Sequence, residues 1–150
     1  MWFAVGPTGR GGGASSLIPW PALSLAATLS AAATLALQLG GTAALTGTLA
    51  GTHPGVVAAA GAVTANAVNN IPAYLLLEPA AVDAASAMAL LVGVNAGSVV
   101  TPWASLATLL WADQLRRAGA DVPWGRFVAW GAVLAPVAVA VSTVTLLATL

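Results

Sequence analysis

The stretch VVAAAGAVTANAVNNIPAYLLLEP, residues 56–79, decides the fold class of this protein. An apolar run leads into Asn66, Asn69, Asn70 and Pro72, and a second short apolar run follows them. Each run is about half of the ~20 residues that a membrane-spanning helix needs. Asparagine and proline disfavour a continuous lipid-facing helix, because irregular backbone inside a bilayer must be buried in protein or line a cavity. The pattern predicts a re-entrant hairpin over residues 55–78, with a polar tip between two half-length helices.

A second interrupted segment lies downstream and has the same character. Residues 90–111 read LLVGVNAGSVVTPWASLATLLW, with glycine, asparagine, serine, threonine and proline between two apolar halves. These residues in the middle of a span are typical of an unwound helix, and transporters use such breaks to place binding groups near the bilayer midplane. We therefore expect a discontinuous transmembrane helix over residues 84–111, with its break at residues 93–102.

The composition supports a membrane protein. The chain is 59% hydrophobic and 5% charged, with a mean hydropathy of +0.94, whereas a soluble domain carries about 25% charged residues. Two further apolar segments, residues 17–39 and 127–150, are long enough to cross a bilayer. The expected domain organisation is a flexible, glycine-rich cytoplasmic lead-in at residues 1–16 and an all-α integral membrane domain at residues 17–150.

The few charged residues predict the orientation. Arg116, Arg117 and Arg126 lie in a polar loop at residues 112–126, and Arg10 precedes the first span. By the positive-inside rule, both the loop and the N-terminus are cytoplasmic. Three crossings and one hairpin then place the C-terminus outside. The N-terminus and the loop can both be cytoplasmic only if residues 55–78 return to the side of the membrane from which they enter.

Several functional classes are excluded by the residues that the chain lacks. It has no cysteine and a single histidine, His53, which leaves no thiolate or histidine cluster for a metal. No Ser–His pairing or cluster of His, Asp and Glu falls within a span, so we expect neither catalytic residues nor an enzyme. The net charge is zero, and the chain has no basic stripe for nucleic acid. The lipid bilayer is the expected surrounding, and no cofactor is expected apart from Na⁺ or H⁺ as a coupling ion.

The candidate substrate- or ion-binding residues are the amides and hydroxyls of the two interrupted segments. Such side chains offer both donors and acceptors, and broken helices add the partial charges of their ends. A small oxyanion or a polyhydroxylated neutral solute suits these groups. The alternative interpretation is that they only hold helices together, as polar residues do in membranes. The candidates are Asn66, Asn69, Asn70, Asn95, Ser98, Thr101 and Ser105.

The two motifs TANAVNNIPAYLLLEP (64–79) and LLVGVNAGSVVTPWASLATLLW (90–111) closely resemble the paired signatures in the second half of ArsB-type arsenite permeases. These permeases belong to the ion-transporter superfamily, alongside citrate and dicarboxylate transporters. The resemblance implies one repeat of an inverted-repeat transporter, with Asn69, Asn70, Asn95, Ser98 and Thr101 lining the pocket. It also implies that this chain corresponds to the C-terminal half only, a fragment whose N-terminal repeat is missing or comes from a partner chain.

The function expected from this resemblance is efflux of arsenite or antimonite, small inorganic oxyacids, across the inner membrane. A homodimer and an ATPase subunit are the further partners that the family implies. The first alternative is a Na⁺- or H⁺-coupled carboxylate or cation transporter of the same superfamily. The second is a non-transporting membrane fragment that packs against a partner. The Asn-Ala-Val-Asn-Asn tip favours the arsenite branch, because carboxylate carriers are expected to use tips richer in serine and threonine.

Overall fold

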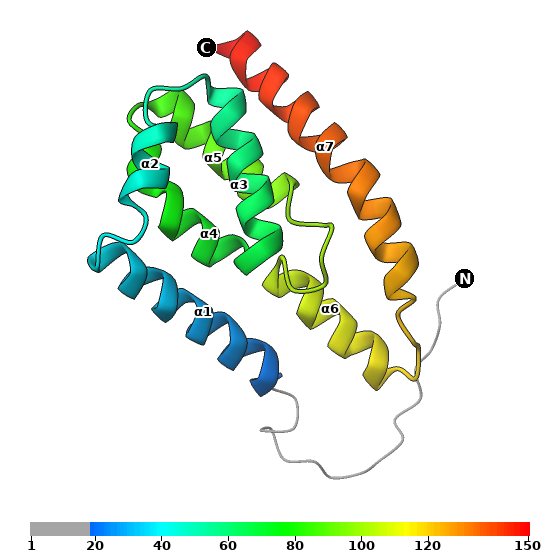
Figure 1. Ribbon diagram of the computed structural model, residues 1–150. Coiled ribbons are helices and arrows are strands. Elements are labelled where there is room, and N and C mark those ends of the chain that lie inside the picture. Colours follow the sequence, from blue (N-terminus) through cyan, green and yellow to red (C-terminus); the bar gives the residue numbers. More distant parts are fainter. Residues whose placement is uncertain (1–18) are drawn as a thin grey trace.

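The computed structural model describes residues 19–150, and within that range every regular element is a helix (Figure 1). The predicted all-α class is therefore confirmed for the part of the chain that is described, while the predicted lead-in at residues 1–16 lies outside it. The elements are α1 (Trp20–Gln38), α2 (Ala43–Leu49), α3 (Pro54–Val68), α4 (Asn70–Leu77), the short 3₁₀ helix η2 (Glu78–Ala80), α5 (Ala84–Ala96), α6 (Leu106–Arg117) and α7 (Trp124–Thr149).

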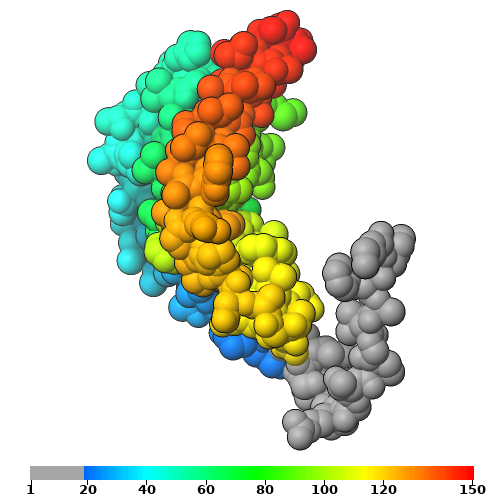
Figure 2. Space-filling model, turned by 90° about the vertical axis from the view of Figure 1, so that its right-hand side faces the viewer, coloured from blue at the N-terminus to red at the C-terminus, as the bar shows by residue number. Residues whose placement is uncertain are grey.

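The two longest helices have the length and composition of membrane spans. α1 has 19 residues and α7 has 26, and only 11% and 22% of their most apolar windows are buried within the molecule. A core helix of a soluble protein would be mostly buried, whereas α7 exposes Trp130, Val141 and Val144 by 61–67%. In Figure 2 the side chains of α7 cover much of the face turned to the viewer. Such apolar surface is stable only against lipid or another apolar protein surface.

Some of the helix ends lie at two opposite ends of the molecule, and others lie near its middle (Figure 1). The start of α1 lies with the end of α6, since Pro19 and Pro21 share a small pocket with Asp113 and Arg116. The C-terminus of α7 lies at the other end, near the loop that precedes α3. α3 and α4 run from that second end to the middle of the molecule and back.

The hairpin turn is tighter than the sequence pattern predicts. α3 continues through Asn66 to Val68, and α4 begins at Asn70, so that Asn69 alone joins the two helices. Pro72 does not break α4, because it lies in the first turn, where a missing N–H costs little. Asn69 has φ 84° and ψ 152°, a conformation that non-glycine residues rarely adopt.

The second interruption lies between α5 and α6, at residues 97–105. α5 begins at an N-cap, where the Asp83 carboxylate accepts a 2.7 Å hydrogen bond from the Ser86 N–H. This bond holds the pKa of the Asp83 carboxyl below its ordinary value of 3.8. α6 extends to Arg117, into the residues expected to form the polar loop. It does so because two arginines in its last turn complement the helix dipole and Arg117 pairs with Asp113 one turn earlier, at 2.7 Å.

The core lies where α3 packs against α5. A Cβ atom added to Gly93 would overlap the backbone carbonyl of Ala58, and one added to Gly97 would overlap the Cβ of Ala62. The two glycines are four residues apart and face two alanines with the same spacing, so small residues let the helix backbones approach closely. This contact holds the end of α5 beside the end of α3, which brings the two interruptions together.

Candidate binding site at the helix breaks

The turn at Asn69 meets the segment 97–105 near the middle of the molecule, and we call this region the junction (Figure 1). Residues from the two segments are more than 30 positions apart in the chain, yet several hydrogen bonds join them. The junction therefore collects the ends of α3 and α5 and the starts of α4 and α6. All of the predicted site residues lie in it or within a few residues of it.

Asn66 is the main crosslink of the junction. Its Nδ2 donates to the carbonyls of Ala62, at 2.8 Å, and Gly97, at 2.7 Å. Its Oδ1 accepts from the backbone N–H groups of Val100 and Thr101, both at 3.0 Å. These four bonds use the full hydrogen-bonding capacity of a carboxamide. The Asn66 side chain thus organises the irregular backbone of residues 97–101, which would otherwise leave polar groups unsatisfied in an apolar interior.

Thr101 and Trp103 complete this crosslink from the other side. The Thr101 hydroxyl donates to the backbone carbonyl of Asn66 at 2.8 Å, and the Trp103 Nε1 donates to the same oxygen at 3.0 Å. Trp103 was not among the residues expected at the site. Its position directly after Pro102 was the available signal, because an indole N–H in apolar surroundings needs a partner and the carbonyls at a helix end supply one.

Asn69 holds the turn between α3 and α4. Its side chain is 1% exposed, and its Nδ2 donates to the carbonyl of Trp103 at 2.8 Å. Its Oδ1 accepts from the Ile71 N–H at 3.4 Å, as a cap of α4. Asparagine tolerates positive φ better than other residues with a Cβ atom, and here its amide also stabilises the strained turn. Asn69 therefore fixes the geometry of the turn and has little capacity left for a ligand.

Asn70 differs from its two neighbours. Its backbone N–H donates to the carbonyl of Ala104 at 2.8 Å, but its buried Oδ1 has no hydrogen-bond partner among the described residues. Leaving such a buried acceptor unpaired costs about 1–3 kcal/mol. Asn70 lines a cavity of about 200 Å³ between α4 and α5, together with Asn95 and Tyr74. The cavity opens at the surface, since Ile71 and Leu91 on its rim are 46% and 42% exposed.

The remaining predicted residues lie at the ends of α5 and α6. Asn95 is exposed in the last turn of α5, and its Nδ2 donates to the Leu91 carbonyl at 2.8 Å. The Ser98 hydroxyl donates to the carbonyl of Asn95 at 3.0 Å and is buried. Ser105 is the N-cap of α6, where its Oγ accepts from the Ala107 N–H at 3.2 Å. The structure therefore brings Asn70 and Asn95 to one cavity, whereas Ser98 and Ser105 form hydrogen bonds at the end of α5 and the start of α6.

The junction carries no formal charge. The residues that line the Asn70–Asn95 cavity include no arginine, aspartate or glutamate, and the chain contains no lysine. Within residues 19–150, no group of three or more His, Asp or Glu residues could hold a metal ion. The lining combines the polar side chains of Asn70, Asn95 and Tyr74 with the apolar ones of Ile71, Leu75, Leu91 and Val94, so a ligand in the cavity would contact uncharged groups.

The fold and the junction define a membrane protein in which interrupted helices bring polar side chains together in an apolar interior. The model of the family ArsB, arsenical pump membrane protein, matches residues 26–150, and the chain belongs to this family. The resemblance predicted from the two motifs is thereby confirmed, and the match includes the whole junction. Membership places the chain among membrane proteins that transport arsenicals. No curated protein and no solved structure matches the chain.

Proposed function

We propose that this chain forms part of the pathway of an arsenite or antimonite efflux permease and that the substrate binds in the Asn70–Asn95 cavity. The observation that carries the proposal is that Asn70 lines this cavity and that its buried Oδ1 has no hydrogen-bond partner among the described residues. The neighbouring Asn66 and Asn69 are fully engaged with protein groups. A ligand that hydrogen-bonds such an unpaired group removes the free-energy cost of leaving it unpaired, and this gain favours binding.

The chemistry of the substrate fits the groups at this cavity. Arsenite at neutral pH is mostly an uncharged trihydroxy species, and its hydroxyl groups can donate to amide oxygens. A carboxylate substrate would call for a cation or several free N–H donors, but no arginine lines the cavity, and the first N–H groups of α4 are already bonded within the protein. The chain has no cysteine, so nothing here would bind arsenite covalently and prevent its release.

The membrane arrangement that we propose follows from the helix ends. The start of α1 and the α6–α7 loop, which Arg117 of α6 and Arg126 of α7 flank, lie at the cytoplasmic end. α3 and α4 then form a re-entrant hairpin from the outside, α5 and α6 form a discontinuous span, and α7 ends outside the inner membrane. Support comes from the positions of the loops, because residues 50–53 and 81–83 lie at the end opposite the C-terminal end of α6, whose last turn carries two arginines.

The transport unit that we propose contains a second repeat, from a longer chain or a partner. The open side of the cavity, at Ile71 and Leu91, is the surface on which that repeat would close. We assign no proton relay to this chain. An intramembrane carboxylate is the usual proton carrier, whereas Glu78 and Asp83 lie outside the cavity lining.

Binding can be measured on the purified chain by thermal unfolding in detergent with increasing antimonite or arsenite. A ligand that binds the folded state raises its stability by RT ln(1 + [L]/Kd). We expect a concentration-dependent rise in Tm for the wild type, its loss in Asn70→Leu and a weaker rise in Asn95→Ala. Thr145→Val on α7 is the matched control, since it removes an exposed hydroxyl that bonds only the Val141 carbonyl, and it should respond like the wild type.

Transport is tested separately, in cells that lack arsenite efflux and express this chain together with the complementary repeat. Lower intracellular arsenite with the wild type and the control, but not with Asn70→Leu, is the expected result. If antimonite stabilised the Asn70→Leu protein as much as the wild type, the proposal that the substrate binds in this cavity would be wrong. Unchanged accumulation with folded protein in the membrane would reject arsenite as the substrate.

A further inference from the structure

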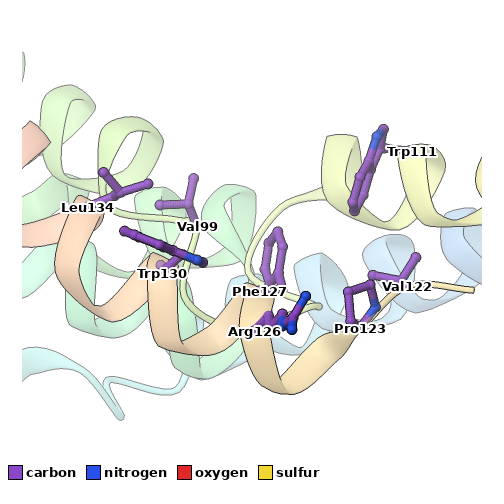
Figure 3. A pocket seen from close by; sticks show the side chains of 9 residues that line it. Val99, Trp111, Val122, Pro123, Arg126, Phe127, Trp130 and Leu134 are labelled. Carbon is purple, nitrogen blue, oxygen red and sulfur yellow. The ribbon is translucent and has the colours of Figure 1, made fainter.

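A second hollow lies between α6 and the first half of α7, with Val99 of the junction segment at one end (Figure 3). This groove has a volume of about 340 Å³, within the range of about 300–1,000 Å³ that ligand pockets occupy. Trp111 lines it from α6, and Phe127 and Trp130 line it from α7. Val99 and Leu134 lie toward one end and Val122 and Pro123 toward the other. All of these side chains are uncharged, so the groove suits an elongated apolar group.

Among the residues that the structure describes, Arg126 is the only charged one that lines the groove. In Figure 3 its side chain lies beside Phe127, midway along the groove. Asp113, the acidic residue of α6, is engaged by Arg117 at 2.7 Å and by Arg116 at 3.9 Å. Among residues 19–150, no carboxylate lies within ion-pair distance of Arg126. A cation next to an apolar groove, without a protein anion, is complementary to a ligand with an anionic head and an apolar body.

The place of Arg126 on its helix strengthens this argument. α7 begins at Trp124, so Arg126 lies in the first turn, where the helix dipole disfavours a cation and favours an anion. The positive-inside rule accounts for an arginine in this part of the chain, but not for its position over an apolar groove at a helix start. The N–H groups of Trp124 and Arg126 already donate to the carbonyls of Val122 and Pro123, so a phosphate bound there would hydrogen-bond the guanidinium and gain only the dipole of the 26-residue helix besides.

We infer that the groove binds an anionic phospholipid, with its phosphate on Arg126 and an acyl chain along Phe127, Trp130 and Leu134. The aromatic residues at this level are typical of a membrane interface, since Trp111, Trp124 and Phe127 form one cluster with ring centroids 5.6–6.1 Å apart. Lipid tails fill apolar grooves in any bilayer, so the arginine supplies the selectivity. With the proposed orientation, the site faces the cytoplasmic leaflet, where anionic lipids attract basic residues.

Quenching of tryptophan fluorescence by lipids with brominated acyl chains tests this site. The full chain is reconstituted in mixtures of phosphatidylglycerol and phosphatidylcholine, with either lipid brominated in turn, and the relative association constant is obtained from the two series. We expect the wild type to prefer phosphatidylglycerol about fivefold, the factor that corresponds to ~1 kcal/mol for one arginine near an anionic surface. Arg126→Gln should reduce the preference to about one, and Trp130→Phe should remove much of the selective quenching.

Arg116→Gln is the matched control, because Arg116 is 69% exposed and lines a different pocket, near the start of α1. It should keep the preference. A wild-type preference near one would overturn the inference without the need for any variant. So would an equal loss in Arg116→Gln and Arg126→Gln, which would show a general effect of surface charge. If the Trp130→Cys protein formed a crosslinked dimer and the wild type showed no selective quenching, a second copy of the chain, and not a lipid, would cover the groove.

Discussion

At the residue scale, three asparagines within five positions have three different roles. Asn66 crosslinks α3 to the segment 97–105, Asn69 holds a strained turn, and Asn70 has an unpaired side-chain oxygen beside a cavity. The difference arises from the helix geometry, because successive residues at a helix end point in different directions. A single substitution should therefore affect either stability or binding, depending on the asparagine that is changed.

We predict that Asn69→Gly is more stable than Asn69→Ala by about 1 kcal/mol, because glycine adopts positive φ without strain and alanine does not. Both variants lose the hydrogen bonds to Trp103 and Ile71, so both should be less stable than the wild type, Asn69→Ala by about 2–3 kcal/mol. Unfolding in detergent, followed by circular dichroism, gives the order. Equal stability of the two variants would mean that backbone strain at this turn is negligible.

At the scale of the elements, the packing of α3 on α5 aligns the two interruptions. Gly93 and Gly97 contact Ala58 and Ala62 so closely that a side chain on either glycine would overlap the facing helix. If α5 were displaced along or away from α3, the segment 97–105 would no longer reach Asn66. The glycine pair therefore acts on the site without contacting a ligand.

Gly93→Ala should destabilise the protein by about 1–3 kcal/mol, the usual cost of overpacking, even though alanine is the better helix former. The added Cβ meets the Ala58 backbone, which cannot move aside as a flexible side chain would. Gly47→Ala in α2 provides the control, since nothing lies within 4 Å of the added Cβ, and it should be neutral or slightly stabilising. Thermal unfolding of both variants in the same detergent compares them directly. A Gly93→Ala protein as stable as Gly47→Ala would contradict the close packing.

At the scale of the whole molecule, the positions of three loops bear on the topology. Residues 50–53 and 81–83 lie at one end, and residues 118–123 lie at the other. If α3 and α4 together made a single crossing of the membrane, the two loops that flank them would lie on opposite sides. The proposed topology requires them to be on the same side.

The absence of cysteine makes this topology accessible to single-cysteine labelling without background. We predict that Ala50→Cys and Val82→Cys react with an impermeant maleimide from outside intact cells, whereas Ala120→Cys reacts only after the membrane is opened. All three positions are exposed, so accessibility reports the side of the membrane rather than burial. Labelling of Ala50→Cys and Val82→Cys from opposite sides would rule out a re-entrant hairpin.

Much of the element layout could be predicted locally. Short apolar runs around Asn69 and around residues 97–105 indicated both interruptions, because polar residues and proline are incompatible with a continuous lipid-facing helix. The ends of the helices were predicted less accurately. α3 includes Asn66 and α6 includes Arg116 and Arg117, since capping and ion pairs extend helices through polar residues. The contribution of Trp103 was missed, because its hydrogen bond depends on a carbonyl 37 positions away.

By itself, the sequence determined the membrane class, the two interruptions and the family, because composition, apolar length and motif order are properties of the linear chain. Only the tertiary structure decided which asparagine of the motif keeps a buried side-chain oxygen without a partner among the described residues. Hydrogen bonds from Asn66 and Asn69 to residues 97–103 span 31–35 positions, and they depend on the contact of Gly93 and Gly97 with α3. Identical side chains in one motif thus acquire different roles, because the pairing of a polar group is fixed by the backbone that folding brings beside it.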